Sequence, residues 1–117
     1  MSDTIRIYHN PRCSKSRATL ALLEENDVQA DVIEYLDTPP TAGQLDDILN
    51  MLGLEPRELM RTHEAEYKDA GLDDSALTRE QLIDAMIKHP KLIERPIVVK
   101  GGKAAIGRPP ERVLDIL

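Results

Sequence analysis

Two short apolar runs separated by one helical stretch restrict the fold of this chain more than any other feature. Residues 5–8 and 31–35 have the apolar and β-branched composition of short strands, and residues 14–26 between them have that of a helix. Strands joined through a helix pair in parallel by a right-handed crossover. The chain therefore begins with a β-α-β unit. Its helix carries apolar residues around much of its surface, so we expect it to be well buried.

The segment of residues 41–90 predicts three helices. Thr41 and Thr78 are each followed three residues later by a glutamine, which is the pattern of a capping box, and each pattern precedes apolar residues at helical spacing. Gly53 suits the end of the first of these helices. Pro56 is placed to open a short helix that reaches residue 60.

The end of the chain predicts a hairpin and a last helix. Residues 96–100 and 103–106 have strand composition and are joined by Gly101 and Gly102, a pair suited to a tight turn. Pro109 and Pro110 can open the final helix. The order β-α-β, helices, β-β-α predicts an α/β protein with a thioredoxin-like fold. We expect a single domain over residues 1–117, with a four-stranded mixed sheet and a helical insertion at about residues 41–90.

Composition argues against several functions. The net charge of −6 and the presence of only three aromatic residues, all tyrosine, argue against a nucleic-acid partner. No apolar run approaches the roughly 18 residues of a membrane span, and the N-terminus does not have the pattern of a secretory signal. One cysteine fits a reducing compartment, so we expect a cytoplasmic protein. The histidines are far apart and one cysteine gives no zinc pattern, so no metal site is expected.

Cys13 is the candidate nucleophile, because it stands where the first strand passes into the first helix. A lone cysteine is often only a small buried packing residue. At a helix start, however, the partial positive charge and the free backbone N–H groups favour the reactive thiolate. Nearby cations add to this effect. The N–H groups belong to Ser14, Lys15 and Ser16, which we expect to bind an anion, and the cations are Arg12, Lys15 and Arg17.

His9 and Asn10 precede the cysteine by four and three residues. His9 is either an ordinary residue at a strand end or a neighbour that stabilises the thiolate, and the residue pattern leaves both open. Asn10 is expected to tie the turn to its own backbone.

Three arginines outside the first helix could form an anion site. Arg61, Arg95 and Arg108 would each be read alone as a surface residue, but guanidinium groups together match tetrahedral oxyanions. Arg108 also stands where a helix N-cap is expected, and arginine is not favoured there.

Taken in order, several segments resemble the ArsC-type, glutaredoxin-coupled arsenate reductases. These segments are residues 9–17, 59–62, 67–72, 94–97 and 106–109. The resemblance implies that Cys13 attacks arsenate, that Arg61, Arg95 and Arg108 hold the oxyanion, and that His9 helps the thiolate to form. It also implies a cis-proline at Pro96 beside the cysteine. No cofactor is expected to be bound; glutathione would be the co-substrate and glutaredoxin the partner. Arg12 and Lys15 replace small residues of the loop in plasmid-borne members.

Two other functions share these features. One is a glutathione-linked thiol oxidoreductase that acts on another substrate with the same site. The other is a regulatory binding module like the Spx-type transcription regulators, which contact RNA polymerase. Those regulators usually carry a Cys-x-x-Cys switch, whereas this chain has Ser16 at the second position. The three arginines favour an oxyanion site.

Overall fold

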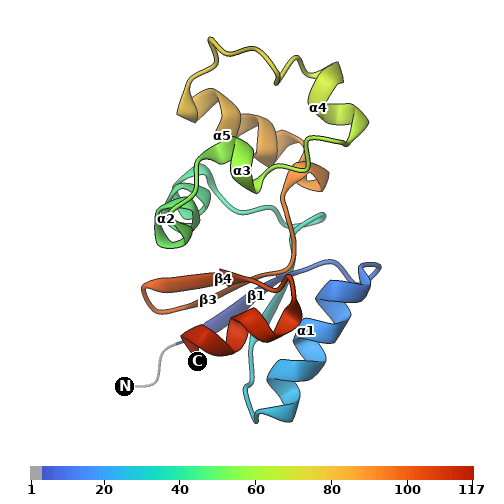
Figure 1. The fold of residues 1–117 in the computed structure, drawn as a ribbon, viewed down its shortest axis with the longest axis vertical. Coiled ribbons are helices and arrows are strands. Elements are labelled where there is room, and N and C mark those ends of the chain that lie inside the picture. The colour runs from blue at the N-terminus through green and yellow to red at the C-terminus, as the bar shows by residue number, and fades with distance from the viewer. Residues whose placement is uncertain (1–3) are drawn as a thin grey trace. The chain divides into compact units, whose positions relative to one another are not determined.

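This computed structural model describes residues 4–117, which form two compact units. The first unit combines the residues up to 38 with residues 95–117, and the second contains residues 39–94. Figure 1 shows the helices and strands of both units. Since the first unit draws on both ends of the chain, its sheet depends on contacts between residues far apart in sequence.

The first unit is built on a four-stranded mixed sheet with the order β2-β1-β3-β4. Strand β1 pairs in parallel with β2, where Ile7 lies opposite Val32, and antiparallel with β3, where Ile7 lies opposite Val98. Strands β3 and β4 form the predicted hairpin. The predicted sheet is therefore confirmed. Its strands are β1 (Ile5–His9), β2 (Asp31–Glu34), β3 (Ile97–Lys100) and β4 (Lys103–Ile106).

Two helices pack together on this sheet, as Figure 1 shows. They are α1 (Ser14–Glu25) and η2 (Pro110–Ile116). The core between them and the sheet contains fully buried aliphatic side chains, among them Ile7, Leu23, Val98 and Val113. The predicted last helix is present as a 3₁₀ helix, in which Arg112 N–H donates to the Pro109 carbonyl three residues back at 3.1 Å.

The expectation that α1 is well buried was wrong. Only Ser16, Thr19 and Leu23 are buried on this helix, whereas Ala18 and Ala21 are exposed. These buried residues lie on one stripe with a spacing of three and four, which is the stripe that an outer-layer helix turns toward its sheet. Composition alone overestimated the burial, because α1 lies on the outside of its unit.

The second unit is helical throughout its described elements. The three predicted helices are present, and both predicted capping boxes are confirmed: Gln44 N–H donates to Thr41 Oγ1 at 3.1 Å, and Gln81 N–H to Thr78 Oγ1 at 3.2 Å. Gly53 ends α2 in the left-handed conformation, with φ of 68°. Two short helices, α4 and η1, were not predicted. The elements are α2 (Ala42–Leu52), α3 (Pro56–Leu59), α4 (Ala65–Asp69), α5 (Arg79–Lys88) and η1 (Pro90–Leu92).

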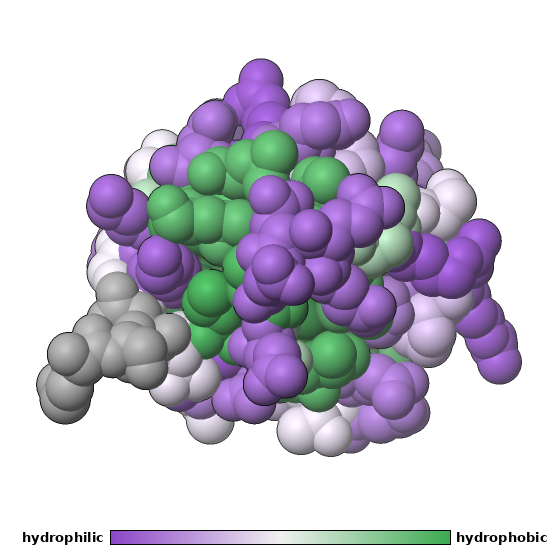
Figure 2. Space-filling model, turned by 90° about the horizontal axis from the view of Figure 1, so that it is seen from below, coloured by the Kyte–Doolittle hydropathy of each residue, from purple (hydrophilic) through white to green (hydrophobic). Residues whose placement is uncertain are grey.

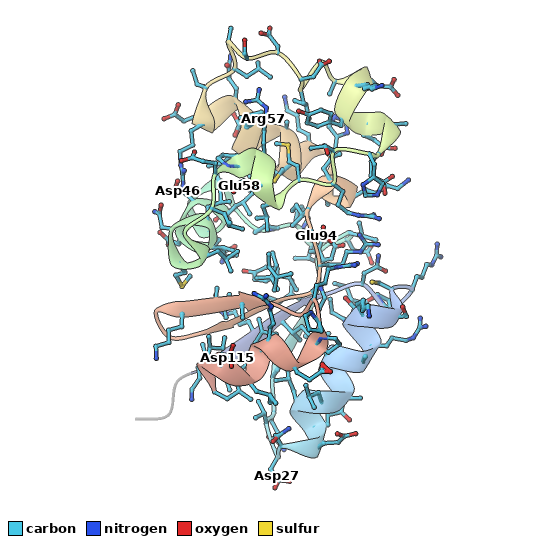
Figure 3. All side chains as sticks on the ribbon, viewed as in Figure 1. Asp27, Asp46, Arg57, Glu58, Glu94 and Asp115 are labelled. Atoms are coloured by element: carbon cyan, nitrogen blue, oxygen red, sulfur yellow. The ribbon has the colours of Figure 1, made fainter. Side chains whose placement is uncertain are left out.

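Arginine side chains connect distant segments of the second unit. Arg57, labelled on α3 in Figure 3, donates to the carbonyl oxygens of Leu72 at 3.2 Å and Asp74 at 2.5 Å. Arg79 at the start of α5 donates to Asp46 of α2 at 2.8 Å. These bonds hold the segment after α4 against α3, and α5 against α2.

The surface is mixed in polarity. Figure 2 shows apolar areas that polar side chains divide from one another. Within residues 4–117, no helix is both long enough and apolar enough to cross a membrane. The large apolar side chains that are exposed are Val32, Leu36, Leu114 and Leu117.

Candidate active site

A hydrogen-bonded turn presents Cys13 at the start of α1. Cys13 is the N-cap of this helix, with extended backbone angles, and its N–H donates to the Asn10 carbonyl at 3.0 Å. Asn10 Oδ1 accepts from Arg12 N–H at 3.0 Å, which confirms that Asn10 ties the turn to its own backbone. Asn10 N–H in turn donates to the buried Ser16 Oγ at 3.2 Å. The turn is therefore fixed both by itself and by α1.

The pKa of the Cys13 thiol is set by opposing effects. Burial raises it most strongly, since Cys13 is only 8% exposed. The backbone N–H groups of Ser16 and Lys15 lower it by hydrogen bonding to the sulfur, and the charges of Arg95 and Arg108 lower it further. The pKa of Cys13 is lowered overall, so these four contributions together outweigh burial. The expected thiolate-stabilising helix start is thus present.

Arg108 makes the closest side-chain contact with the sulfur. Its Nη2 lies 3.8 Å from Cys13 Sγ, and its Nε donates to the Arg95 carbonyl at 2.8 Å. The bond from Nε to the Arg95 carbonyl orients the guanidinium plane of Arg108, so that its Nη2 group faces the Cys13 sulfur. Arg95 and Arg108, predicted from sequence as anion-binding residues, therefore lie together near Cys13.

Gly107 allows the chain to pass close to Cys13's helix. Its N–H donates to the Pro96 carbonyl at 2.9 Å. A Cβ added at this position would lie 2.8 Å from Pro96 Cγ and closer still to Thr19 Oγ1 of α1, which no side chain can tolerate without movement. Gly107 directly follows the strand predicted at residues 103–106, and no role was predicted for it. Its role in the close approach between β4 and α1 was missed, because nothing local in the sequence indicates that Thr19 is its neighbour.

Pro96 occupies the position that the resemblance assigned to it. The Arg95–Pro96 peptide bond is cis, and so is Arg108–Pro109. Both bonds involve an arginine of the predicted anion site. The first bond precedes the hairpin of β3 and β4, and the second follows it.

His9 lies at the end of β1, opposite Glu34 of β2. The side chain is buried, and its Nδ1 has no hydrogen-bond partner within the part of the chain that is described. Burial lowers the pKa of His9, Arg17 lowers it further and Glu34 raises it. The lowered pKa favours the neutral imidazole. A direct effect of His9 on the thiolate stays a prediction.

Arg61, the third predicted arginine, belongs to the second unit. Its backbone N–H donates to the Leu92 carbonyl at 2.7 Å, and its side chain forms an ion pair with Glu64 at 2.6 Å. The remaining predicted residues, Ser14 and Lys15, have exposed side chains at the start of α1. The first unit thus brings together Cys13, the N–H groups of Lys15 and Ser16, and two of the three arginines.

Among residues 4–117, no three or more histidine, cysteine, aspartate or glutamate side chains lie close enough together to hold a metal ion.

The four-stranded mixed sheet, with a cysteine at the start of the helix that follows β1, places this protein in the class of thioredoxin-like α/β proteins. The model of the ArsC family matches residues 8–116, and the chain belongs to that family.

Relatives extend this similarity over the whole chain. An arsenate reductase from Neisseria meningitidis serogroup A is 53% identical over 114 residues, which cover 97% of each chain. The uncharacterized protein YfgD of Escherichia coli K12 is 58% identical over 118 residues, covering 100% of this chain and 99% of its own. Among solved structures, an arsenate reductase from Vibrio cholerae superposes with a TM-score of 0.95 at 52% identity, with both chains covered completely.

Proposed function

We propose that this protein is an arsenate reductase that works through a covalent adduct on Cys13. The observation that carries the proposal is the lowered pKa of Cys13, with the Arg108 guanidinium 3.8 Å from its sulfur. A thiolate beside a cation is suited to attack an anionic centre, since the same guanidinium that stabilises the sulfur can also hold an oxyanion. Family membership and the names of the relatives support arsenate as that anion.

The proposed reaction begins with the sulfur. The Cys13 thiolate attacks As(V), a sulfur–arsenic bond forms, and one oxygen leaves as water after protonation. Glutathione then replaces a second oxygen, again with loss of water. A glutaredoxin thiolate attacks the glutathione sulfur, which breaks its bond to arsenic and leaves the electron pair there. Arsenic is reduced to As(III) while the two outside thiols are oxidised to one mixed disulfide, and water then releases arsenite and restores Cys13.

The chain's own residues supply binding and charge stabilisation in this scheme. Arg61, Arg95 and Arg108 would hold the oxyanion, because guanidinium groups pair with its oxygens through parallel N–H bonds. The N–H groups of Lys15 and Ser16, which donate to the sulfur in the resting protein, would stabilise Cys13 again as the leaving thiolate in the last step.

Outside thiols are required, because the chain contains one cysteine. Glutathione as co-substrate and glutaredoxin as partner meet this requirement without any bound cofactor. A compartment that keeps both reduced, such as the cytoplasm, fits the scheme.

A coupled assay tests the proposal. NADPH oxidation is followed with arsenate, glutathione, glutaredoxin and glutathione reductase, for the wild type and for Cys13→Ser. An arsenate-dependent rate that the Cys13→Ser variant lacks is expected. A wild type that turns over no arsenate, although its thiol reacts rapidly with an alkylating agent, would show that the site serves another substrate. Omitting glutaredoxin and then glutathione identifies which outside thiol is needed.

A further inference from the structure

We propose that Glu64 is an internal anion that occupies Arg61 and so weakens the affinity of Arg61 for the substrate oxyanion. The inference rests on the proposed function insofar as Arg61 is taken as an oxyanion-binding residue. Glu64 would then be a residue that determines how tightly this chain binds its substrate.

The contact between Arg61 and Glu64 is short and sheltered. Glu64 Oε1 lies 2.6 Å from Arg61 Nη1, and the two side chains are only 15% and 18% exposed. Both residues belong to one turn, in which Glu64 N–H donates to the Arg61 carbonyl at 3.1 Å. Since solvent screens the pair only partly, its interaction is stronger than that of an ordinary surface ion pair.

Further contacts hold both partners in place. Lys91 Nζ lies 3.5 Å from Glu64 Oε2, so the carboxylate is anchored on its second oxygen as well. The backbone of Arg61 is bonded to the Leu92 carbonyl at 2.7 Å, next to Lys91 in sequence. The carboxylate is therefore held against the guanidinium by the second unit itself, with no ligand required.

The chemistry of the pair implies competition with a substrate. A carboxylate and an oxyanion use the same guanidinium N–H donors. Glu64 takes Nη1, and Nη2 lies 3.2 Å from His63 Nε2, so both terminal nitrogens already have neighbours. An arriving oxyanion must share or displace these contacts, and the negative charge of Glu64 repels it. A neutral amide at position 64 removes this repulsion but keeps nearly the same shape.

Direct binding measures this effect without turnover. Arsenate is titrated calorimetrically into Cys13→Ser protein, which cannot form the adduct, with and without Glu64→Gln. We expect Glu64→Gln to bind arsenate about five- to tenfold more tightly, or roughly 1 kcal/mol. Glu64→Asp, which keeps the charge, should stay near the original affinity, and circular dichroism checks that each variant is folded.

Glu66→Gln is the matched control. Glu66 also lies near Lys91, at 3.8 Å, but it has no contact with Arg61 among the interactions found in residues 4–117. Its removal tests whether any loss of negative charge in this region tightens binding. We expect the arsenate affinity to change by less than twofold.

Turnover provides a second readout. In the coupled assay with Cys13 intact, Glu64→Gln should lower KM for arsenate while kcat changes little, because the competition affects binding and not the chemical step. Weaker or unchanged arsenate binding by Glu64→Gln would overturn the inference, as would equal tightening by Glu66→Gln or no arsenate binding by any variant. If the proteins bind arsenate with the expected order but do not reduce it, the proposed function fails and this inference stands.

Discussion

Arg108 Nη2 lies 3.8 Å from Cys13 Sγ, although 95 positions separate the two residues in sequence. The contact joins the start of the first helix to the end of the β3–β4 hairpin. Burial raises the pKa of Cys13, and the backbone N–H groups of Ser16 and Lys15, followed by the charges of Arg95 and Arg108, lower it below its ordinary value. This long-range contact is therefore one of the contributions that favour the thiolate.

Removing the Arg108 charge should make the thiol less reactive. We expect the rate of Cys13 alkylation by iodoacetamide to have a lower pH midpoint in the wild type than in an unperturbed cysteine peptide. In Arg108→Leu the midpoint should rise, and the rate at pH 7 should fall at least threefold, because less thiolate is present. Arg112→Leu, which removes an exposed arginine of η2, is the control and should leave the midpoint unchanged. A midpoint equal in wild type and Arg108→Leu would contradict the role given to Arg108.

Filling the space at Gly107 should destabilise the protein. In Gly107→Ala the new methyl group meets Thr19 and Pro96, and relieving such overpacking costs about 1–3 kcal/mol. Gly102→Ala is the control, because no atom lies within 4 Å of a Cβ built there. Urea unfolding followed by circular dichroism compares the two variants. An equal free energy of unfolding for both would show that the close approach at Gly107 does not matter.

His9 should make stability fall in mild acid. Its pKa is lowered in the folded protein relative to about 6.5 in the unfolded chain, so the unfolded chain binds the proton more readily. The free energy of unfolding should therefore be unaffected by His9 above pH 6.5 and should decrease as the pH falls below it. Urea unfolding at pH 7.5 and 5.5 measures this decrease, which His9→Gln should reduce. His89→Gln, a change at an exposed histidine, is the matched control variant.

Arg12 and Lys15 should favour reaction of the thiol with anionic reagents. Both side chains are exposed on either side of Cys13, and the cations attract a negative reagent such as glutathione or iodoacetate. We expect the ratio of iodoacetate to iodoacetamide rates to fall about two- to fivefold in a double variant with glutamine at positions 12 and 15. Because ions screen exposed charges, 0.5 M salt should lower the wild-type ratio too. Lys103→Gln changes an exposed lysine on β4 and should leave the ratio of the two rates unchanged. If neither salt nor the double substitution changes the ratio, the prediction is wrong.

Local patterns predicted those parts of the fold that local forces determine. The capping boxes at Thr41 and Thr78 and the left-handed Gly53 were predicted correctly, because each depends on residues within one turn. Helix α4 was missed, since its five residues bury no side chain and so have no apolar periodicity. The burial of α1 was overestimated, because exposure depends on which elements cover a helix.

The candidate site shows the same division. The turn that presents Cys13 could be predicted from nearby residues, since Asn10 and the helix start act locally. The approach of Arg108 to the sulfur could not be derived from spacing and was implied only by the family resemblance. The pairing of Glu64 with Arg61 was not anticipated, although the two residues are three apart, because the sequence does not show that both would be sheltered from solvent.

The first unit is assembled from both ends of the chain, which has a consequence during synthesis. While the protein emerges from the ribosome, Cys13 is exposed long before Arg95 and Arg108 have been added. A nascent chain therefore lacks the guanidinium groups of Arg95 and Arg108 beside its thiol, and its cysteine should be less reactive than that of the folded protein. The sulfur gains the contribution of these two arginines only once the last strands have joined the sheet, so newly made protein acquires the full charge environment of its thiol together with its finished fold.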